Sequence, residues 1–238
     1  MSKVLYDIFE KTWKRTDSSS IWLYSDPHFG EPDLFEIRGD MTPDEQVRRI
    51  NSKVGKYDTI IFLGDIGDIE YIKKIRGYKV LILGNHDKGK SNYERVREEI
   101  KCFDSSKLTL ANVVFGDLQK GFSTRIEDNK LFDEVYDGEL TISNKIRLTH
   151  IPEISPYVLN IHGHCHPYEK LDFTGLSYDA IIKRHLERTI AAGIPELNLC
   201  CEYTNFYPIN LNAIVKSGIL KLVKDPVRDL IDSKDLKK

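Results

Sequence analysis

Short apolar runs alternate with polar segments along much of the chain. The runs are rich in Ile, Val and aromatic residues and end at Gly, Pro or polar residues, which is typical of buried strands. They span residues 21–24, 59–63, 79–83 and 145–149. Helical patterns separate them, at residues 2–15, 42–55, 68–76 and 91–101. The helix at 42–55 has a clear start, because Thr42 is an N-cap, Pro43 occupies the first position and Glu45 completes a capping box. Alternating strands and helices predict an α/β fold.

The pattern changes after residue 108, where shorter strands are predicted. These lie at residues 112–115, 131–136, 139–142, 145–149 and 157–161. Asp137-Gly138 is a strong tight-turn signal between two of them. A second, more antiparallel sheet is therefore expected. A further helix is predicted at 178–191, and the charged tail at 225–238 predicts a peripheral helix.

Bulk properties predict one domain over residues 1–238, with its core at about 20–210. Hydrophobic residues make up 40% and charged residues 30%, as in ordinary globular proteins. The net charge of −2 gives no electrostatic case for nucleic-acid or membrane binding. No apolar run is long enough to span a membrane, and the N-terminus lacks the apolar segment of a signal peptide. We therefore expect a cytoplasmic protein without a membrane partner.

Histidine is concentrated in one short segment, Ile161-His162-Gly163-His164-Cys165-His166. Three of the seven histidines lie within five residues, which packing alone does not explain. Neutral imidazole is a good ligand for Zn, Fe, Mn or Ni. The segment therefore indicates part of a transition-metal site.

Further polar residues follow the other predicted strands, where parallel sheets place their ligands. They are Asp26, His28, Asp65, Asp68, Asn85, His86, Asp87 and His150. The alternative is that Asp and Asn simply cap the helices that follow. That alternative does not explain why six of the seven histidines occupy these loops.

These motifs occur in a fixed order: D-x-H at 26, G-D-x-x-D at 64, G-N-H-D at 84, a single His at 150 and G-H-x-H at 163. In this order they resemble the calcineurin-like metallophosphoesterase superfamily, over residues 20–167. The resemblance implies a two-sheet β-sandwich flanked by helices, in four αββα layers. The start, Trp22 to Gly30, resembles a compact bacterial and phage branch, which has His where this chain has Glu31.

The resemblance also implies two divalent metal ions, with Mn favoured and Fe, Zn, Ni or Mg as alternatives. One would be held by Asp26, His28, Asp65 and His166, and the other by Asp65, Asn85, His150 and His164. The shared Asp65 would bridge them, and a metal-bridging hydroxide would attack phosphorus. His86 would be the general acid, oriented by Asp68. Asp87 could orient it instead or cap a helix, and Asp68 could itself be an N-cap.

The remaining residues of interest receive secondary roles. His162 is interpreted as supporting the site or facing solvent, and His185 as a solvated surface residue. Cys165 is interpreted as a filler between ligands, and Cys200-Cys201 as small hydrophobes in a buried strand. Arg38 and Lys88 could contact a substrate phosphate, although surface solvation is the commoner state of single basic residues.

The predicted function is a phosphodiesterase or phosphatase acting on a small phosphoester. A small nuclease on DNA or RNA ends is an alternative, although the charge does not indicate nucleic-acid binding. A non-catalytic protein-binding module on the same fold is a second alternative, which should lack ligands that this chain has. The superfamily's protein phosphatases carry Arg after G-D-x-x-D, and Ile69 here argues against a phosphoprotein substrate.

Overall fold

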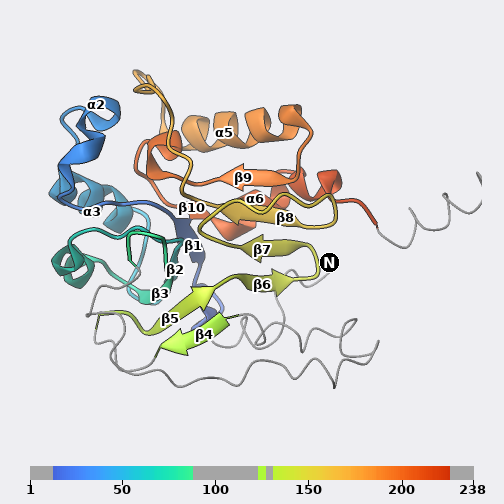
Figure 1. The fold of residues 1–238 in the computed structure, drawn as a ribbon, viewed down its shortest axis with the longest axis horizontal. Coiled ribbons are helices and arrows are strands. Elements are labelled where there is room, and N and C mark those ends of the chain that lie inside the picture. Colours follow the sequence, from blue (N-terminus) through green and yellow to red (C-terminus); the bar gives the residue numbers. More distant parts are fainter. Residues whose placement is uncertain (1–12, 88–122, 127–130, 226–238) are drawn as a thin grey trace, which may run out of the picture.

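The computed structural model describes residues 13–87, 123–126 and 131–225, and contains two β-sheets (Figure 1). The larger sheet has six strands in the order β10-β1-β2-β3-β5-β4. Its strands are β1 (Ile21–Tyr24), β2 (Thr59–Phe62), β3 (Tyr78–Ile82), β4 (Ser123–Ile126), β5 (Glu134–Gly138) and β10 (Ile209–Asn210). Strands β1, β2, β3 and β5 are parallel, and the edge strands β10 and β4 are antiparallel to their neighbours.

The smaller sheet has four strands in the order β6-β7-β8-β9. They are β6 (Leu140–Ser143), β7 (Ile146–Leu148), β8 (Leu159–His162) and β9 (Glu196–Asn198). Only the β6–β7 pair is antiparallel, since β7, β8 and β9 run parallel. The expectation of a second, more antiparallel sheet is therefore wrong.

The two sheets pack against each other through one apolar core. Leu23 and Ile61 of the larger sheet share a buried cluster with Leu148 and Ile161 of the smaller one. On the opposite face of the larger sheet, Tyr24, Phe62 and Leu81 belong to a second cluster with the helix α3 (Pro43–Asn51). Alternate residues of β1, β2 and β3 thus pack into different cores, which explains why these strands are mostly apolar.

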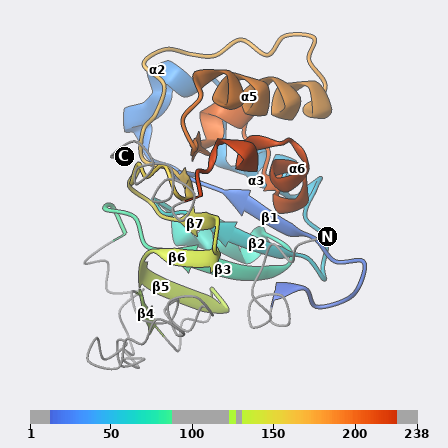
Figure 2. The same ribbon diagram turned by 90° about the vertical axis from the view of Figure 1, so that its right-hand side faces the viewer.

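Helices flank the sheets on two sides (Figures 1 and 2). The α-helices are α2 (Phe35–Arg38), α3 (Pro43–Asn51), α5 (Tyr178–Ala192) and α6 (Leu211–Lys216). Short 3₁₀ helices are η1 (Pro32–Leu34), η2 (Ile69–Lys74), η5 (Cys201–Thr204) and η6 (Ile219–Leu222). The Thr42 hydroxyl accepts the Glu45 N–H, so the predicted N-cap of α3 is formed. Two sheets with flanking helices confirm the predicted α/β fold class.

Some sequence predictions about elements differ from the structure, and others fall largely outside the residues that it describes. Asp137 and Gly138 are not a hairpin turn but the end of β5, and only Glu139 separates β5 in one sheet from β6 in the other. The helix predicted at 68–76 is a 3₁₀ helix. The helices predicted at 91–101 and 225–238, most of the one at 2–15, and the strand at 112–115 lie outside the described residues.

No helix within the described ranges is long and apolar enough to span a membrane.

Candidate metal centre

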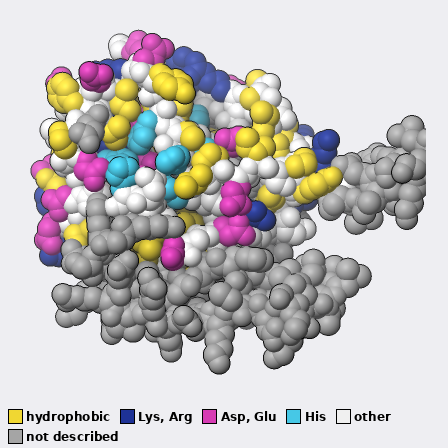
Figure 3. Space-filling view, viewed as in Figure 1, with side chains coloured by type: hydrophobic (Ala, Val, Ile, Leu, Met, Phe, Trp, Pro, Cys, Tyr) yellow, Lys and Arg dark blue, Asp and Glu magenta, His cyan; other side chains and the backbone are white. Residues whose placement is uncertain are grey.

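The carboxyl ends of strands from both sheets meet at one face of the molecule. Figure 3 shows histidine side chains gathered there. The loops after β1, β2 and β3 bring the residues near 26, 65 and 85, and those after β7 and β8 bring His150 and the segment 163–166. Within each sheet, backbone hydrogen bonds tie these loops together. The His28 N–H donates to the Asp65 carbonyl (2.9 Å), and the Gly163 N–H donates to the His150 carbonyl (3.0 Å).

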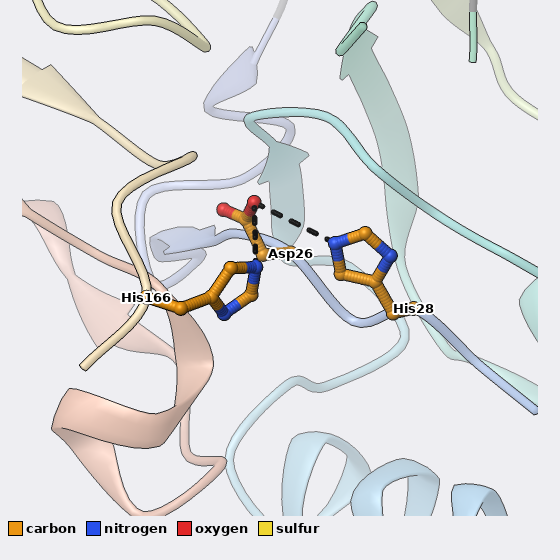
Figure 4. Close-up of side chains that lie close together, drawn as sticks. All are labelled: Asp26, His28 and His166. Carbon is orange, nitrogen blue, oxygen red and sulfur yellow. Dashed lines mark ion pairs between the residues drawn. The ribbon is translucent and has the colours of Figure 1, made fainter. Parts of the chain in front are cut away.

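Asp26, His28 and His166 form a first group of side chains that could hold a metal ion (Figure 4). Asp26 Oδ1 lies 3.9 Å from His28 Nε2 and 3.7 Å from His166 Nε2. The Asp26 carboxylate is buried and also accepts the His164 backbone N–H at 3.0 Å. The group therefore presents one carboxylate and two imidazole nitrogens to a common point.

Asp65, His150 and His164 form a second group. Asp65 Oδ2 lies 3.3 Å from His150 Nε2. Asn85 joins this group, because its Oδ1 is 2.8 Å from His150 Nε2 and 3.0 Å from His164 Nδ1. The two groups divide the seven side chains in the way the resemblance implied.

Asp65 lies between the two groups. The Oδ2 atom that faces His150 is also 3.5 Å from His28 Nε2. Its other oxygen accepts the His86 backbone N–H at 2.9 Å, which fixes the carboxylate orientation. Burial acts to raise the pKa of Asp65, but the hydrogen bond and charge of His150 outweigh it and lower this pKa to about 2. A carboxylate that stays ionised and faces both groups is suited to bridge two cations.

Backbone strain is concentrated at these residues. Six non-glycine residues in the described ranges have positive φ, and four of them are Asp26 (54°), His28 (40°), Asp65 (54°) and His164 (66°). Each such conformation costs on the order of 1–3 kcal/mol and persists where the surrounding structure enforces it. The fold therefore holds these side chains in an arrangement that local preferences disfavour.

The donor set fits divalent cations. His28 Nε2 is buried and has no hydrogen-bond partner among the described residues, although two carboxylates lie within 4 Å. A buried polar atom without a partner calls for an explanation, and a cation between these donors supplies one. Mixed imidazole, carboxylate and amide donors suit Mn, Fe, Zn or Ni.

His86 is exposed at the edge of the first group, with its ring centroid 5.3 Å from that of His28. Asp68 does not hydrogen-bond to His86 in the described structure. Instead its Oδ1 accepts the Glu70 N–H and caps η2, which is the alternative role considered for it. Asp87 is buried and accepts the backbone N–H groups of Asp65, Ile66 and Gly84, so it holds two of the site's loops together.

Arg38 differs from both roles expected of it, since it is neither solvated nor free to reach a phosphate. Its side chain is buried and bonds Glu202 at 2.7 Å. It also donates to the backbone carbonyls of Asp26 (2.7 Å) and Pro27 (2.5 Å). All of its nitrogen atoms are thus engaged by the protein. Lys88, the other predicted phosphate contact, lies outside the described residues.

His162, His185 and Cys165 belong to neither group. His162 is buried and bonds Glu196 Oε1 (2.8 Å), away from both groups. His185 is half-buried, stacks on Tyr203 and bonds the Asn198 carbonyl, so the surface interpretation is wrong. Cys165 is exposed.

Cys200 and Cys201 are buried, as expected, but they follow β9 and do not lie in a regular strand. Cys200 pairs with Ser25 in an isolated bridge, and Cys201 begins η5. Their sulfur atoms lie next to Asp26, near the start of the loop after β1. Cys200 Sγ lies 3.4 Å from Asp26 Oδ2, and Cys201 Sγ lies 3.2 Å from the Asp26 carbonyl.

Sequence reasoning missed Glu202 as a part of the site. Its Oε2 accepts from His166 Nδ1 at 3.1 Å. Burial acts to raise the pKa of Glu202, but His166 and Arg38 outweigh it and lower this pKa. The available signal was a single carboxylate next to the apolar run 199–201, because a buried charge requires a partner.

Comparison with known proteins agrees with this geometry. Residues 19–190 match the calcineurin-like phosphoesterase family, and the chain belongs to that family. Comparison with curated proteins found no match. Among solved structures, the protein of unknown function AQ665 from Aquifex aeolicus is similar at 21% identity and a TM-score of 0.49. The similarity covers 84% of this chain and 99% of that one.

Proposed function

We propose that this protein is a hydrolase that uses two divalent metal ions to cleave a small phosphoester. The observation that supports the proposal best is the position of Asp65 between two groups of His and Asp donors. Family membership supports metal-dependent phosphoester hydrolysis as the reaction class. Mn is the metal we favour.

The chain's own residues would position the reactants and handle the proton. When bound, the ions would activate water as the nucleophile and neutralise charge on the phosphoryl oxygens. His86 would donate a proton to the leaving oxygen, since it is exposed beside the first group and its backbone is held by Asp65. Asn85, His150 and His164 add no negative charge to a site that must accept an anionic phosphate.

The substrate proposed is a small phosphodiester or phosphomonoester in the cytoplasm. Ile69 follows the G-D-x-x-D motif where the protein phosphatases have Arg, which argues against a phosphoprotein. The near-neutral charge gives little support to a nucleic-acid substrate. A nuclease and a non-catalytic binding module are the competing functions that the experiment must separate.

The test is an activity assay on metal-free protein reloaded with Mn²⁺. Nitrophenyl monoester and diester substrates and a short single-stranded oligonucleotide are compared. We expect Mn²⁺-dependent hydrolysis of at least one nitrophenyl ester, which a chelator abolishes and Asp65→Asn lacks. His185→Gln is the matched control, because Gln can keep the bond to the Asn198 carbonyl outside the site.

Each other outcome has a definite meaning. Cleavage of the oligonucleotide alone would favour the nuclease. No turnover of any substrate by protein that binds two Mn²⁺ would favour the binding module. Turnover that persists in Asp65→Asn would contradict the proposed site.

A further inference from the structure

The imidazole of His166 is held by a carboxylate on the side away from the metal-binding group. Its Nδ1 bonds Glu202 Oε2 at 3.1 Å, while its Nε2 faces Asp26 Oδ1 at 3.7 Å. A carboxylate on one ring nitrogen fixes the tautomer and orientation of the ring, and makes the other nitrogen a better metal donor. Glu202 is therefore positioned to orient the Nε2 atom of His166 toward a cation.

His28 has the same arrangement with a different carboxylate. Its Nδ1 lies 2.5 Å from Glu31 Oε2, and its Nε2 faces Asp26 and Asp65. Glu31 is three residues away on the same loop, whereas Glu202 is 36 residues from His166. Each histidine of the first group thus has a carboxylate at its Nδ1, and the two carboxylates come from segments far apart in the sequence.

Among the described residues, the second group shows no such carboxylate. His150 Nδ1 bonds the uncharged Leu63 backbone carbonyl at 2.7 Å. His164 faces the proposed donor Asn85 Oδ1 through its Nδ1 at 3.0 Å, and no carboxylate of the described residues bonds its other ring nitrogen. The difference divides the site into one half with carboxylate-supported imidazoles and one half without them.

Glu202 is better placed to support His166 than to bind a cation itself. Its Oε1 bonds the Arg38 guanidinium at 2.7 Å and its Oε2 bonds His166. A cation at Glu202 would displace one of these bonds and would lie beside the buried positive charge of Arg38. Arg38 also bonds the Asp26 and Pro27 carbonyls, so it fixes Glu202 and the loop after β1 together.

We propose that Glu31 and Glu202 are positioning residues that strengthen cation binding by Asp26, His28 and His166, without being ligands themselves. The inference rests on the proposed function, since it requires metal at this centre. Loss of such a carboxylate costs about 10- to 100-fold in metal affinity in comparable sites. The loss should fall on the first group, because within the described residues its two histidines are the proposed ligands that have carboxylate partners of this kind.

The test measures Mn²⁺ binding by Glu31→Gln and Glu202→Gln in two backgrounds, with equilibrium dialysis as the readout. His150→Ala weakens the second group, so the remaining ion reports on the first. Asp26→Asn weakens the first group, so the remaining ion reports on the second. Glu196→Gln is the matched control, because Glu196 bonds His162 outside both groups. Its side chain is 26% exposed, close to the 31% of Glu31.

In the His150→Ala background, we expect Glu31→Gln and Glu202→Gln each to raise the Mn²⁺ Kd about 10- to 100-fold. Glu196→Gln should stay within about twofold of its parent, and so should all three variants in the Asp26→Asn background. The visible spectrum of Co²⁺-loaded protein should also change in the first background and not in the second. Glu31→Gln alone decides the matter if the buried Glu202 variant does not fold, as judged by circular dichroism.

Two results would overturn the inference while leaving the proposed function intact. One is an unchanged Kd in Glu31→Gln in the His150→Ala background. The other is an equal loss of affinity in both backgrounds, which would indicate a general structural effect. Failure of the wild-type chain to bind any Mn²⁺ would overturn the proposed function and this inference together.

Discussion

At the scale of single residues, hydrogen bonds from neighbouring groups fix the orientation of several side chains of the centre. Asp65 is fixed by the His86 N–H, and Asp26 by the His164 N–H. His28 and His166 are each held at Nδ1 by a carboxylate. A site that is held so tightly loses function when a supporting bond is removed, and not only when a ligand is removed.

His86→Ala should retain both metal ions and slow hydrolysis of esters with poor leaving groups by about 10²-fold or more. Nitrophenyl esters should be affected far less, because their leaving group needs little protonation. Steady-state kinetics on a leaving-group series checks the prediction, with His185→Gln as control. Loss of metal from His86→Ala would show instead that His86 is a ligand.

Arg38→Met should lower the free energy of unfolding by about 3–5 kcal/mol, because it leaves the buried Glu202 carboxylate without its cation. Denaturant unfolding of metal-free protein measures the change. Arg48→Met is the matched control, since Arg48 also pairs with a glutamate but its side chain is 66% exposed. Equal destabilisation by both substitutions would contradict the structural role given to Arg38.

The role of a residue could be predicted from the sequence where that residue comes soon after a predicted strand. Asp26, Asp65 and His150 follow apolar runs directly, so their convergence follows from the parallel strands. Glu202 could not be placed, because its role depends on His166 and Arg38, which are 36 and 164 residues away. Asp68 was assigned by resemblance to orient His86; in the structure its Oδ1 caps η2, and the assignment stays a prediction.

At the scale of elements, the loops after the strands position the donors by close backbone packing. A Cβ atom at Gly163, after β8, would overlap Asp26 Oδ2 and Ser25 Oγ. The absence of a side chain at Gly163 therefore lets the loop from the smaller sheet reach the loop from the larger one. Asp87 adds to this packing by bonding the backbone of the loops after β2 and β3.

Gly163→Ala should weaken Mn²⁺ binding by at least about tenfold, because relieving the overlap must separate His164 from Asp26. Isothermal titration with Mn²⁺ measures the effect. Gly55→Ala is the control, since a Cβ there would meet the Asp58 side chain at 3.3 Å from Oδ2 and 3.8 Å from Cγ, well beyond the overlap distances at Gly163. Unchanged affinity in Gly163→Ala would show that the loop can move without consequence for the centre.

Elements were predictable where the local signal was strong. The strands β1, β2 and β3 and the helices α3 and α5 lie within a few residues of the predicted ranges. The turn predicted at Asp137-Gly138 was wrong, because such a dipeptide indicates only that the backbone can bend there. It does not indicate which strand the following strand pairs with. Gly138 has φ of 134° at the point where the chain passes from one sheet to the other.

At the scale of the whole molecule, the centre joins the two sheets. Asp26, Asp65 and Asn85 follow strands of the larger sheet, and His150, His164 and His166 follow strands of the smaller one. An ion bound by donors from both sheets binds only the folded chain. Metal binding is therefore linked to the stability of the whole domain.

Mn²⁺ at about 100 times its Kd should add about 2.7 kcal/mol of stability per site. For a chain of this size, that corresponds to a rise in Tm of about 5–10 °C. Calorimetry with Mn²⁺ and with a chelator measures the shift. Asp65→Asn, which alters the shared ligand, should show little shift, and an equal shift in both proteins would place the bound ions elsewhere.

The central claim is that two cations lie on either side of Asp65, and anomalous diffraction from Mn²⁺-loaded crystals tests it most directly. Two anomalous peaks are predicted, about 3.5–4 Å apart. One should lie among Asp26, His28 and His166, and the other among Asn85, His150 and His164. A single peak between His166 and Glu202, or no peak at either group, would contradict it.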